Sequence, residues 1–253
     1  MLKQVQHDRN TRYMLNLTSK ISHLKSNTYA IIVAGGSGSR MQSALPKQFI
    51  ELCGEPVMMH TIRVFHQSKT SPQIILALNP GYHDLWKELC HKYNFKIPHT
   101  VVAGGQTRFH SVKNAVDSIT EDNALIAVHD AVRPLTPLSV IDESYEQAAK
   151  NGSAVAAVKS RDSVRQLNGE LTSCLDRENI YLVQTPQTFQ SALLKKAYEQ
   201  GYVESFTDDA SVVERSGVKI HLIEGSHSNI KITFPEDMAI AEAVLNKKAI
   251  SNS

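Results

Sequence analysis

Residues 30–41 read Ala-Ile-Ile-Val-Ala-Gly-Gly-Ser-Gly-Ser-Arg-Met, and residues 46–48 read Pro-Lys-Gln. The apolar run at 31–33 is β-branched, which is typical of a strand covered on both faces. The glycines that follow let the backbone turn sharply and bring its amide groups close to an anion without a Cβ clash. Arg40 and Lys47 add two full positive charges beyond the turn. The stretch therefore predicts a site for a nucleoside triphosphate.

Two commoner glycine-rich motifs do not fit this loop. A P-loop ends in Gly-Lys-Ser or Gly-Lys-Thr, whereas Gly38 is followed by Ser39 and Arg40. A dinucleotide-binding turn needs a third glycine three residues after Gly38, where Met41 stands. The plainest alternative is a surface turn with unrelated basic neighbours. The preceding strand and the spacing of the two cations argue against it.

The bulk composition is that of an ordinary globular chain. Its 253 residues are 42% apolar and carry a formal net charge of +2, which gives no argument for a nucleic acid or an anionic membrane as partner. Cys53, Cys90 and Cys174 form no C-x-x-C pair, so we interpret them as reduced thiols of a cytoplasmic protein. Because no apolar run approaches the length of about 18 residues that a bilayer requires, we also expect no membrane span.

Residues 1–28 differ from the rest of the chain. They are polar and basic, contain Asp8 as their one acid, and lack the apolar core of a secretory signal. A flexible extension, with Met14 as an alternative start, and a short organellar presequence are the two interpretations. We expect a single domain over residues 29–248.

From residue 29 onward, short apolar runs alternate with patterns of helical period. This alternation predicts βαβ units, and hence an α/β fold with a mostly parallel sheet and helices on both faces. Ligands of such sheets bind at the carboxyl ends of the strands. The glycine loop and residues 129–134 each follow a predicted strand, so we expect them to meet at one edge. The predicted strands are 31–33, 74–78, 100–103, 125–128 and 154–158, and the predicted helices are 57–66, 82–93, 108–118, 138–150 and 191–200.

Residues 162–177 break this alternation. Two strand-like runs flank Asn168-Gly169, and Asn-Gly is the strongest short signal for a hairpin. An isolated hairpin is marginally stable in water. We therefore expect a protruding β-arm at about 162–177 that packs against a second subunit.

Several further motifs occur in an order that resembles one enzyme family. They are Gly104-Gly105 with Arg108 and Ser111, His129-Asp130-Ala131-Val132-Arg133-Pro134, Asp176-Arg177, Gln184-Thr185-Pro186-Gln187, Thr207-Asp208-Asp209-Ala210-Ser211, and Asn229-Ile230-Lys231. With the glycine loop, they make residues 29–245 similar to the 2-C-methyl-D-erythritol 4-phosphate cytidylyltransferases. The resemblance implies a Rossmann-like nucleotidyltransferase fold and transfer of CMP from CTP to the polyol phosphate, with release of pyrophosphate. It also implies a divalent cation such as Mg²⁺ and a homodimer that interlocks through the arm.

Transfer of a nucleotidyl group requires cations around the α-phosphate, a carboxylate for a divalent metal and a reader for the base. Asp130 follows a buried strand and is our candidate for Mg²⁺, which proteins usually hold through one or two carboxylates and substrate phosphates. We interpret His129 as structural, since imidazole is a poor magnesium ligand. Asp208 and Asp209 are interpreted as a helix N-terminus rather than as a metal pair.

The resemblance carries the remaining roles onto single residues. Arg133 either contacts phosphate or pairs with Asp130, and Arg177 reaches from the arm into the partner's site. Gln106 and Ser228 stand where many family members have acids. The expected catalytic residues are Arg40, Lys47, Arg177 and Lys231; the nucleotide contacts are Ala34, Gly35, Gly36, Gly38, Gly105, Arg108, Ser111, Asp130 and Ala131; the polyol phosphate contacts are Arg133, Thr185, Arg177 and Lys231; and the metal ligand is Asp130.

Three alternatives stand beside this interpretation. A ribitol 5-phosphate cytidylyltransferase has similar motifs, although Asp176-Arg177 favours the methylerythritol substrate. A catalytically silent nucleotide-binding protein would lack Arg40, Lys47 or Asp130, and all three are present. A sugar nucleotidyltransferase usually continues into a further domain, which we do not expect here.

Overall fold

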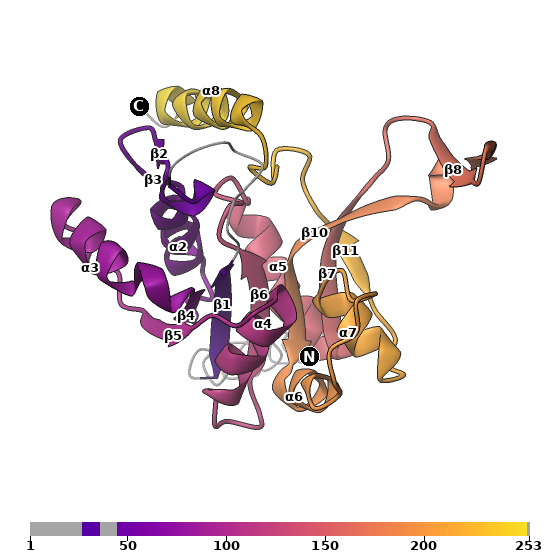
Figure 1. Ribbon diagram of the computed structural model, residues 1–253, viewed down its shortest axis with the longest axis horizontal. Coiled ribbons are helices and arrows are strands. Elements are labelled where there is room, and N and C mark those ends of the chain that lie inside the picture. Colours follow the sequence, from indigo (N-terminus) through magenta and orange to yellow (C-terminus); the bar gives the residue numbers. More distant parts are fainter. Residues whose placement is uncertain (1–26, 36–44, 252–253) are drawn as a thin grey trace, which may run out of the picture.

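The computed structural model describes residues 27–35 and 45–251. Three of the expected site residues, Gly36, Gly38 and Arg40, lie outside the described residues, as does nearly all of the expected N-terminal extension. The described chain has an α/β architecture, with a central sheet, helices packed around it and an arm that extends away from the body (Figure 1). None of the described helices combines the length and apolar character needed to cross a bilayer.

The central sheet confirms the prediction of a mostly parallel arrangement. Its strand order is β11-β7-β10-β6-β1-β4-β5, and β10 is the described strand that runs antiparallel to its neighbours. The predicted strands are all present, each longer by a few residues or equal in length. The bounds are β1 Thr28–Ala34, β4 Gln73–Leu78, β5 Thr100–Ala103, β6 Leu125–Asp130, β7 Ser153–Lys159, β10 Tyr181–Gln190 and β11 Leu222–Glu224.

Strand β10 was not predicted, because its sequence carries few strand signals. It contains Pro186, which lacks the N–H group needed in a sheet ladder, and several polar side chains. The pairing of β10 with β7 shifts register between Val183 and Gln187, so the proline lies at this irregularity. Thr185, just before the proline, lies beside the end of β6, where its hydroxyl accepts from the Asp130 amide at 3.1 Å.

Helices cover both faces of the sheet, as predicted (Figure 1). Alternate residues of β1 explain this arrangement, because Ala30 and Ile32 pack into one apolar cluster and Tyr29 and Ile31 pack into the other. The first cluster includes α2 (Val57–Gln67), α3 (His83–Lys92) and α5 (Leu138–Asn151), and the second includes α4 (Arg108–Asp117), α6 (Ser191–Tyr198) and α7 (Asp209–Arg215). All five predicted helices are present with bounds shifted by up to two residues.

The C-terminal helix α8 (Pro235–Ser251) was not predicted. It packs Ala241 onto a third, smaller cluster that includes Leu52 and Ile232. Leu52 belongs to a short antiparallel ribbon of β2 (Glu51–Leu52) and β3 (Glu55–Pro56), which lies under α8 in Figure 1. This cluster fixes the segment that carries residues 229–232 against the body of the protein.

The predicted β-arm is confirmed as a hairpin of β8 (Val164–Asn168) and β9 (Leu171–Leu175). Gly169 in its turn has φ of 63°, a backbone conformation that glycine adopts readily. The arm protrudes from the body and leaves Leu167 and Leu171 exposed by 69% and 78% (Figure 1). A short helical turn, η4 (Arg177–Asn179), follows β9 and leads into β10.

Candidate functional site

The glycine loop and the segment after β6 begin at the same edge of the sheet, as their positions after predicted strands indicated. Val33 is the register partner of Asp130, and the Ala131 amide donates to the Val33 carbonyl over 3.0 Å. Ala34 ends β1 and is buried, and Gly35 is the last described residue before the loop. The Thr61 hydroxyl of α2 donates to the Ala131 carbonyl over 2.8 Å, so this edge is fixed from the helical layer as well.

The Pro-Lys-Gln segment is attached to the end of β1 through Gln48. The buried Gln48 side chain donates from Nε2 to the Ala34 carbonyl over 3.0 Å. This hydrogen bond anchors the short helical turn η2 (Lys47–Phe49), which carries Lys47. Lys47 Nζ donates to the carbonyl of Ile232 over 2.8 Å, so its cation lies beside the segment that contains Lys231. Lys47 is thus a site residue expected from the sequence, whereas the anchoring role of Gln48 is seen only in the fold.

The loop at Gly105 packs against the start of the glycine loop through Ser111. The Ser111 hydroxyl, fully buried, accepts from the Gly105 amide at 2.9 Å and donates to the Thr107 carbonyl at 3.0 Å. A Cβ atom on Gly35 would lie 2.6 Å from Ser111 Oγ, and a Cβ atom on Gly105 would clash with His110. Both glycines are therefore required by close approach, and Ser111 lies against the start of the glycine loop while it hydrogen-bonds to the Gly105 loop.

Asp130 lies at the centre of a cluster of positive charges. Lys231 Nζ lies 2.9 Å from Asp130 Oδ2, Arg108 Nε lies 3.4 Å from Oδ1, and Arg133 Nε lies 3.5 Å from Oδ2. Burial of Asp130 raises the pKa of its carboxyl group, but the Coulombic attraction of the three cations outweighs burial and holds this pKa well below its usual range. The carboxylate is therefore charged at neutral pH.

Arg133 pairs with Asp130 rather than standing free for another anion. Its Nη1 also donates to the Asn229 carbonyl over 2.7 Å, and its side chain is largely buried. Burial lowers the pKa of Arg133, and the charge on Asp130 opposes that shift. Of the two roles that the sequence leaves open for Arg133, the structure contains the ion pair with Asp130.

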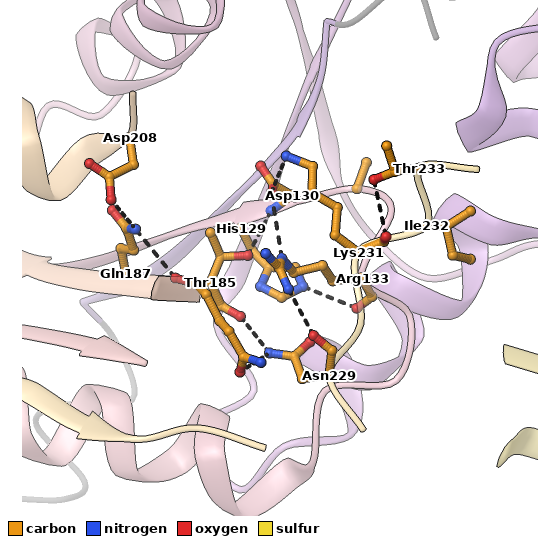
Figure 2. A network of polar contacts seen from close by, with 12 residues as sticks. His129, Asp130, Arg133, Thr185, Gln187, Asp208, Asn229, Lys231, Ile232 and Thr233 are labelled. Atoms are coloured by element: carbon orange, nitrogen blue, oxygen red, sulfur yellow. Dashed lines mark hydrogen bonds and ion pairs between the residues drawn. The ribbon is translucent and has the colours of Figure 1, made fainter. Parts of the chain in front are cut away.

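Asn229 joins the strands and loops that surround Asp130, a role that the sequence analysis did not assign. The fully buried Asn229 amide donates to the Thr185 carbonyl over 2.8 Å and to Gln184 Oε1 over 3.2 Å. Its Oδ1 accepts from the Thr136 hydroxyl over 2.8 Å. Asn229 thus ties β10 and the loop after β6 to the segment of Lys231, which Figure 2 shows reaching Asp130 from the opposite side to Thr185.

Thr185 contacts Asp130 through the main chain. The Asp130 amide donates to Thr185 Oγ1 over 3.1 Å, and the threonine side chain is nearly buried. This contact fixes the orientation of the peptide group that carries the carboxylate. Thr185, Asp130 and Lys231 are therefore brought together from three separate parts of the chain (Figure 2).

His129 has the structural position that the sequence analysis proposed. The ring is fully buried, packs against Phe65 at 4.8 Å between centroids, and contacts the Arg133 carbonyl through Nε2 at 3.2 Å. Since a carbonyl only accepts, Nε2 carries the proton. Burial lowers the pKa of His129 to about 3, so the imidazole is neutral in the folded protein.

The two adjacent aspartates at the start of α7 have different roles. Asp208 caps the helix, accepting from the Ser211 amide over 2.8 Å within a capping box, as predicted. Asp209, which is fully buried, instead accepts from both terminal nitrogens of Arg108, at 2.9 Å and 2.7 Å. The predicted helix N-terminus is therefore confirmed, with Asp208 as its cap. The ion pair between Asp209 and Arg108 was not predicted.

Arg177 does not belong to the Asp130 cluster in this chain. It begins η4 at the base of the arm, its side chain is 55% exposed, and its ion-pair partner is Glu178 at 3.8 Å. Of the two departures from the family pattern, Gln106 is exposed and the Ser228 hydroxyl hydrogen-bonds to the Ser226 hydroxyl at 2.8 Å. The described structure thus brings together Ala34, Gly35, Lys47, Gly105, Arg108, Ser111, Asp130, Ala131, Arg133, Thr185 and Lys231.

The donor set fits a magnesium ion only in the presence of phosphates. Within residues 27–35 and 45–251, no group of three or more histidine, cysteine, aspartate or glutamate side chains is placed to hold a metal. Asp130 offers a single charged carboxylate, which is sufficient when substrate phosphates supply the other ligands. The arrangement as a whole, with clustered cations beside two closely packed glycine-containing loops, is able to bind polyphosphate and stabilise charge that develops on it.

Comparisons with known proteins place these observations in a wider context. The sequence model of the family described as IspD, 2-C-methyl-D-erythritol 4-phosphate cytidylyltransferase, matches residues 28–247. A protein of that name from Bacteroides thetaiotaomicron is 46% identical over 215 residues, which cover 85% of this chain and 98% of the relative. The crystal structure of a protein of the same name from Francisella tularensis is 32% identical and superposes with a TM-score of 0.73 over 86% of this chain and 99% of that one.

A 4-diphosphocytidyl-2C-methyl-D-erythritol synthase from Anaerococcus prevotii gives a similar result. Its crystal structure is 29% identical and superposes with a TM-score of 0.75 over 87% of this chain and 96% of that one. The fold is therefore the Rossmann-like nucleotidyltransferase fold of these structures.

Proposed function

This chain belongs to the IspD family of 2-C-methyl-D-erythritol 4-phosphate cytidylyltransferases. We propose on that basis that the site around Asp130 transfers CMP from CTP to 2-C-methyl-D-erythritol 4-phosphate. The products are pyrophosphate and 4-CDP-2-C-methyl-D-erythritol. The observation that carries the proposal is the convergence of Lys231, Arg108 and Arg133 on Asp130, next to the start of the glycine loop.

The chemical demand of this reaction is electrostatic. A phosphate-monoester oxygen of one anion attacks the α-phosphorus of another, so the protein must neutralise and align both. Lys231 supports this role, because its side chain is 40% exposed and able to turn from Asp130 toward phosphate oxygens. Lys47 donates to the carbonyl of Ile232, the residue after Lys231, and supplies a second cation. We include Arg40, which lies outside the described residues, as a third.

The nucleotide is proposed to lie across the two loops that meet at Ser111. The Gly35 main chain, the Gly105 carbonyl and the second lone pair of the Ala34 carbonyl are proposed to match the amino and carbonyl groups of cytosine. These groups are named because the Gly105 amide already donates to Ser111 and Gln48 already donates to the Ala34 carbonyl. Ser111 supports this arrangement by fixing the Gly105 amide, and Arg108 supplies positive charge at the N-terminus of α4. Asp130 and Ala131 border the same space from the end of β6.

The polyol phosphate is proposed to approach from the side of β10. Thr185 lies on that side of Asp130, and Lys231 reaches the carboxylate from the other side. Asn229 hydrogen-bonds to the main chain of Thr185 and to the side chain of Arg133. In this proposal Arg177 of a second subunit completes the acceptor site, since Arg177 lies at the base of the arm and outside the Asp130 cluster of its own chain.

Magnesium is proposed as the divalent cation of the reaction. When bound, it would neutralise phosphate charge and align the triphosphate. Asp130 would hold it, because this carboxylate is kept ionised by its neighbours and stands at the phosphate side of the site. Bound phosphates would draw Lys231 away from Asp130, because Lys231 is the most exposed of the three cations that pair with this carboxylate.

We further propose a homodimer in the cytoplasm. Leu167 and Leu171 on the arm are apolar side chains with little cover in one chain, and contact with a second subunit would bury them. The three cysteines are not paired with one another, in keeping with a reducing compartment.

The alternative acceptor, ribitol 5-phosphate, is not favoured, because the matching family and the relatives described above carry the methylerythritol name. The test is pyrophosphate release by the purified protein with magnesium and CTP, in parallel wells with each of the two polyol phosphates. Wells with ATP, GTP and UTP serve as matched controls for the base. Release with CTP and methylerythritol phosphate alone supports the proposal, and release with ribitol phosphate in its place contradicts it.

A further inference from the structure

The buried carboxylate of Asp209 is not accounted for by the proposed reaction or by the helix that contains it. Helix α7 is already capped by Asp208, and Ala210 donates its amide to Gln187 Oε1 over 2.8 Å. A fully buried aspartate is costly unless it is paired. Its partners therefore indicate why it is present.

Those partners are Arg108 and Tyr198. Arg108 donates from both terminal nitrogens to the two carboxylate oxygens of Asp209, at 2.9 Å and 2.7 Å, in a bidentate ion pair. The Tyr198 hydroxyl donates to Asp209 Oδ1 over 2.6 Å, and this ring stacks on Phe109, the residue after Arg108. The carboxylate is thus held rigidly from α6 and presents both oxygens to the guanidinium group.

This arrangement limits how Arg108 meets Asp130. Each terminal nitrogen donates one N–H group to Asp209, and in the position that this pair imposes, Nε is the Arg108 atom that contacts Asp130, at the long distance of 3.4 Å. A guanidinium group without that restraint has the donors to form a bidentate pair with Asp130 instead. Such a pair would draw Arg108 away from the nucleotide loop and occupy the carboxylate that Lys231 now contacts.

We propose that Asp209 is a positioning residue that fixes the guanidinium group of Arg108 beside the nucleotide loop and keeps it from engaging Asp130 fully. The proposal rests on the proposed function, since it assumes that Arg108 contributes to the binding of CTP. Asp209 itself touches neither the substrates nor the reacting atoms; it acts through Arg108.

The test is a double-mutant cycle on CTP binding. The variants are Asp209→Asn, Arg108→Lys and the double variant, with Asp208→Asn as the matched control, because it makes the same change one residue away and keeps a residue suited to helix capping. Isothermal titration of CTP in buffer with EDTA gives Kd without turnover, and steady-state assays give KM and kcat. Thermal unfolding of each variant reports any loss of fold.

We expect Asp209→Asn to raise both Kd and KM for CTP by about tenfold or more, the size of effect typical of a lost charged hydrogen bond, with a smaller change in kcat. Asp209→Glu should recover part of the affinity. In the Arg108→Lys background, Asp209→Asn should change Kd by less than about twofold, because the partner is already altered. Asp208→Asn should bind CTP like the wild type.

Three results would overturn the proposal: wild-type affinity in Asp209→Asn, an equal effect of this substitution in both backgrounds, or an equal loss in Asp208→Asn. If Asp209→Asn folds poorly, Tyr198→Phe serves in its place, because it removes the hydrogen bond from α6 to the Asp209 carboxylate. The effect of Tyr198→Phe on the Kd of CTP must also vanish in the Arg108→Lys background. Failure of the proposed function is distinguishable from failure of the Asp209 proposal, because in the first case the wild type itself would release no pyrophosphate from CTP.

An NMR measurement gives a readout independent of activity. The Nε–Hε signal of Arg108, assigned by its loss in Arg108→Lys, should shift in Asp209→Asn and stay in place in Asp208→Asn. An unchanged signal in Asp209→Asn would show that Asp209 does not hold the guanidinium group.

Discussion

Lys231 Nζ lies 2.9 Å from Asp130 Oδ2, which joins the segment before α8 to the end of strand β6. The lysine side chain is 40% exposed, whereas those of Arg108 and Arg133 are 29% and 11% exposed. Of the three cations around the carboxylate, Lys231 is therefore the one that solvent and ligands reach most easily. We interpret Asp130 as the anion that keeps these cations assembled until phosphate oxygens take its place.

Substitution of Lys231 by methionine tests this interpretation. The change keeps most of the side-chain volume and removes the charge, so we expect kcat to fall by about 10²–10³, as for the loss of a group that stabilises transition-state charge. Unfolding should change little, because Arg108 and Arg133 still pair with Asp130. The exposed Lys69, changed to methionine, is the matched control. Steady-state kinetics decide the matter, and a kcat within threefold of wild type would contradict the role.

Substitution of Asp130 by asparagine removes the anion shared by three cations. We expect the free energy of unfolding to fall by about 1–3 kcal/mol, since buried charges lose their partner. We also expect activity to respond less steeply to added magnesium. Urea unfolding and a magnesium titration of pyrophosphate release measure the two effects. An unchanged magnesium response would argue against Asp130 as the metal ligand.

Substitution of Gly35 by alanine tests the packing of the two loops. The new Cβ would lie 2.6 Å from Ser111 Oγ, so we expect destabilisation by about 1–3 kcal/mol and a raised KM for CTP. Ser111→Ala removes that oxygen and leaves an ordinary contact of 3.5 Å to the Cβ of residue 111. The double variant should therefore lose less stability than the sum of the single variants. Gly201→Ala, with no atom within 4 Å of the new Cβ, is the control. Strict additivity in urea unfolding would contradict the contact.

The neutral, buried His129 makes a prediction about acid stability. Its pKa is lowered by burial to about 3 in the folded chain, below about 6.5 in the unfolded chain, so between these values only the unfolded chain binds the proton. Stability is then lost as the pH falls, by about 2 kcal/mol from pH 7 to pH 5. His129→Gln should remove this part of the loss, whereas the exposed His66→Gln should not. Equal slopes of unfolding free energy against pH in all three proteins would contradict the prediction.

Subunit complementation tests the proposed role of Arg177. We expect Arg177→Ala and Lys47→Ala to be inactive separately, because each removes a different part of every site. In mixed dimers, one of the two shared sites would contain neither substitution, so the mixture should recover up to about a quarter of wild-type activity by random assortment. Native mass spectrometry confirms that subunits have exchanged. Inactive mixtures of confirmed heterodimers would exclude a shared site.

The parts of the fold that the sequence predicts are those with local signals. Strands β1 and β6 are β-branched or apolar runs, and the hairpin is marked by Asn168-Gly169 in its turn. The meeting of the glycine loop with Asp130 followed from the rule that ligands bind at the carboxyl ends of parallel strands.

The parts that could not be predicted depend on contacts between distant segments. Strand β10 has polar residues and Pro186, and it forms because β6 and β7 offer it hydrogen bonds on both sides. Two neighbouring aspartates look alike in sequence, and only the approach of Arg108 from α4 makes Asp209 an ion-pair partner while Asp208 caps α7. Gln48 and Asn229 are likewise recognised only through the main-chain groups that they bind.

The most direct test of the whole account is ³¹P NMR of the reaction of CTP and 2-C-methyl-D-erythritol 4-phosphate with the wild type and with Lys231→Met. The wild type should convert both substrates into a pyrophosphate diester with release of one inorganic pyrophosphate per CTP, while the variant leaves nearly all of both unchanged over the same time. The account is contradicted if the wild type forms no diester, or if the variant forms it at the wild-type rate.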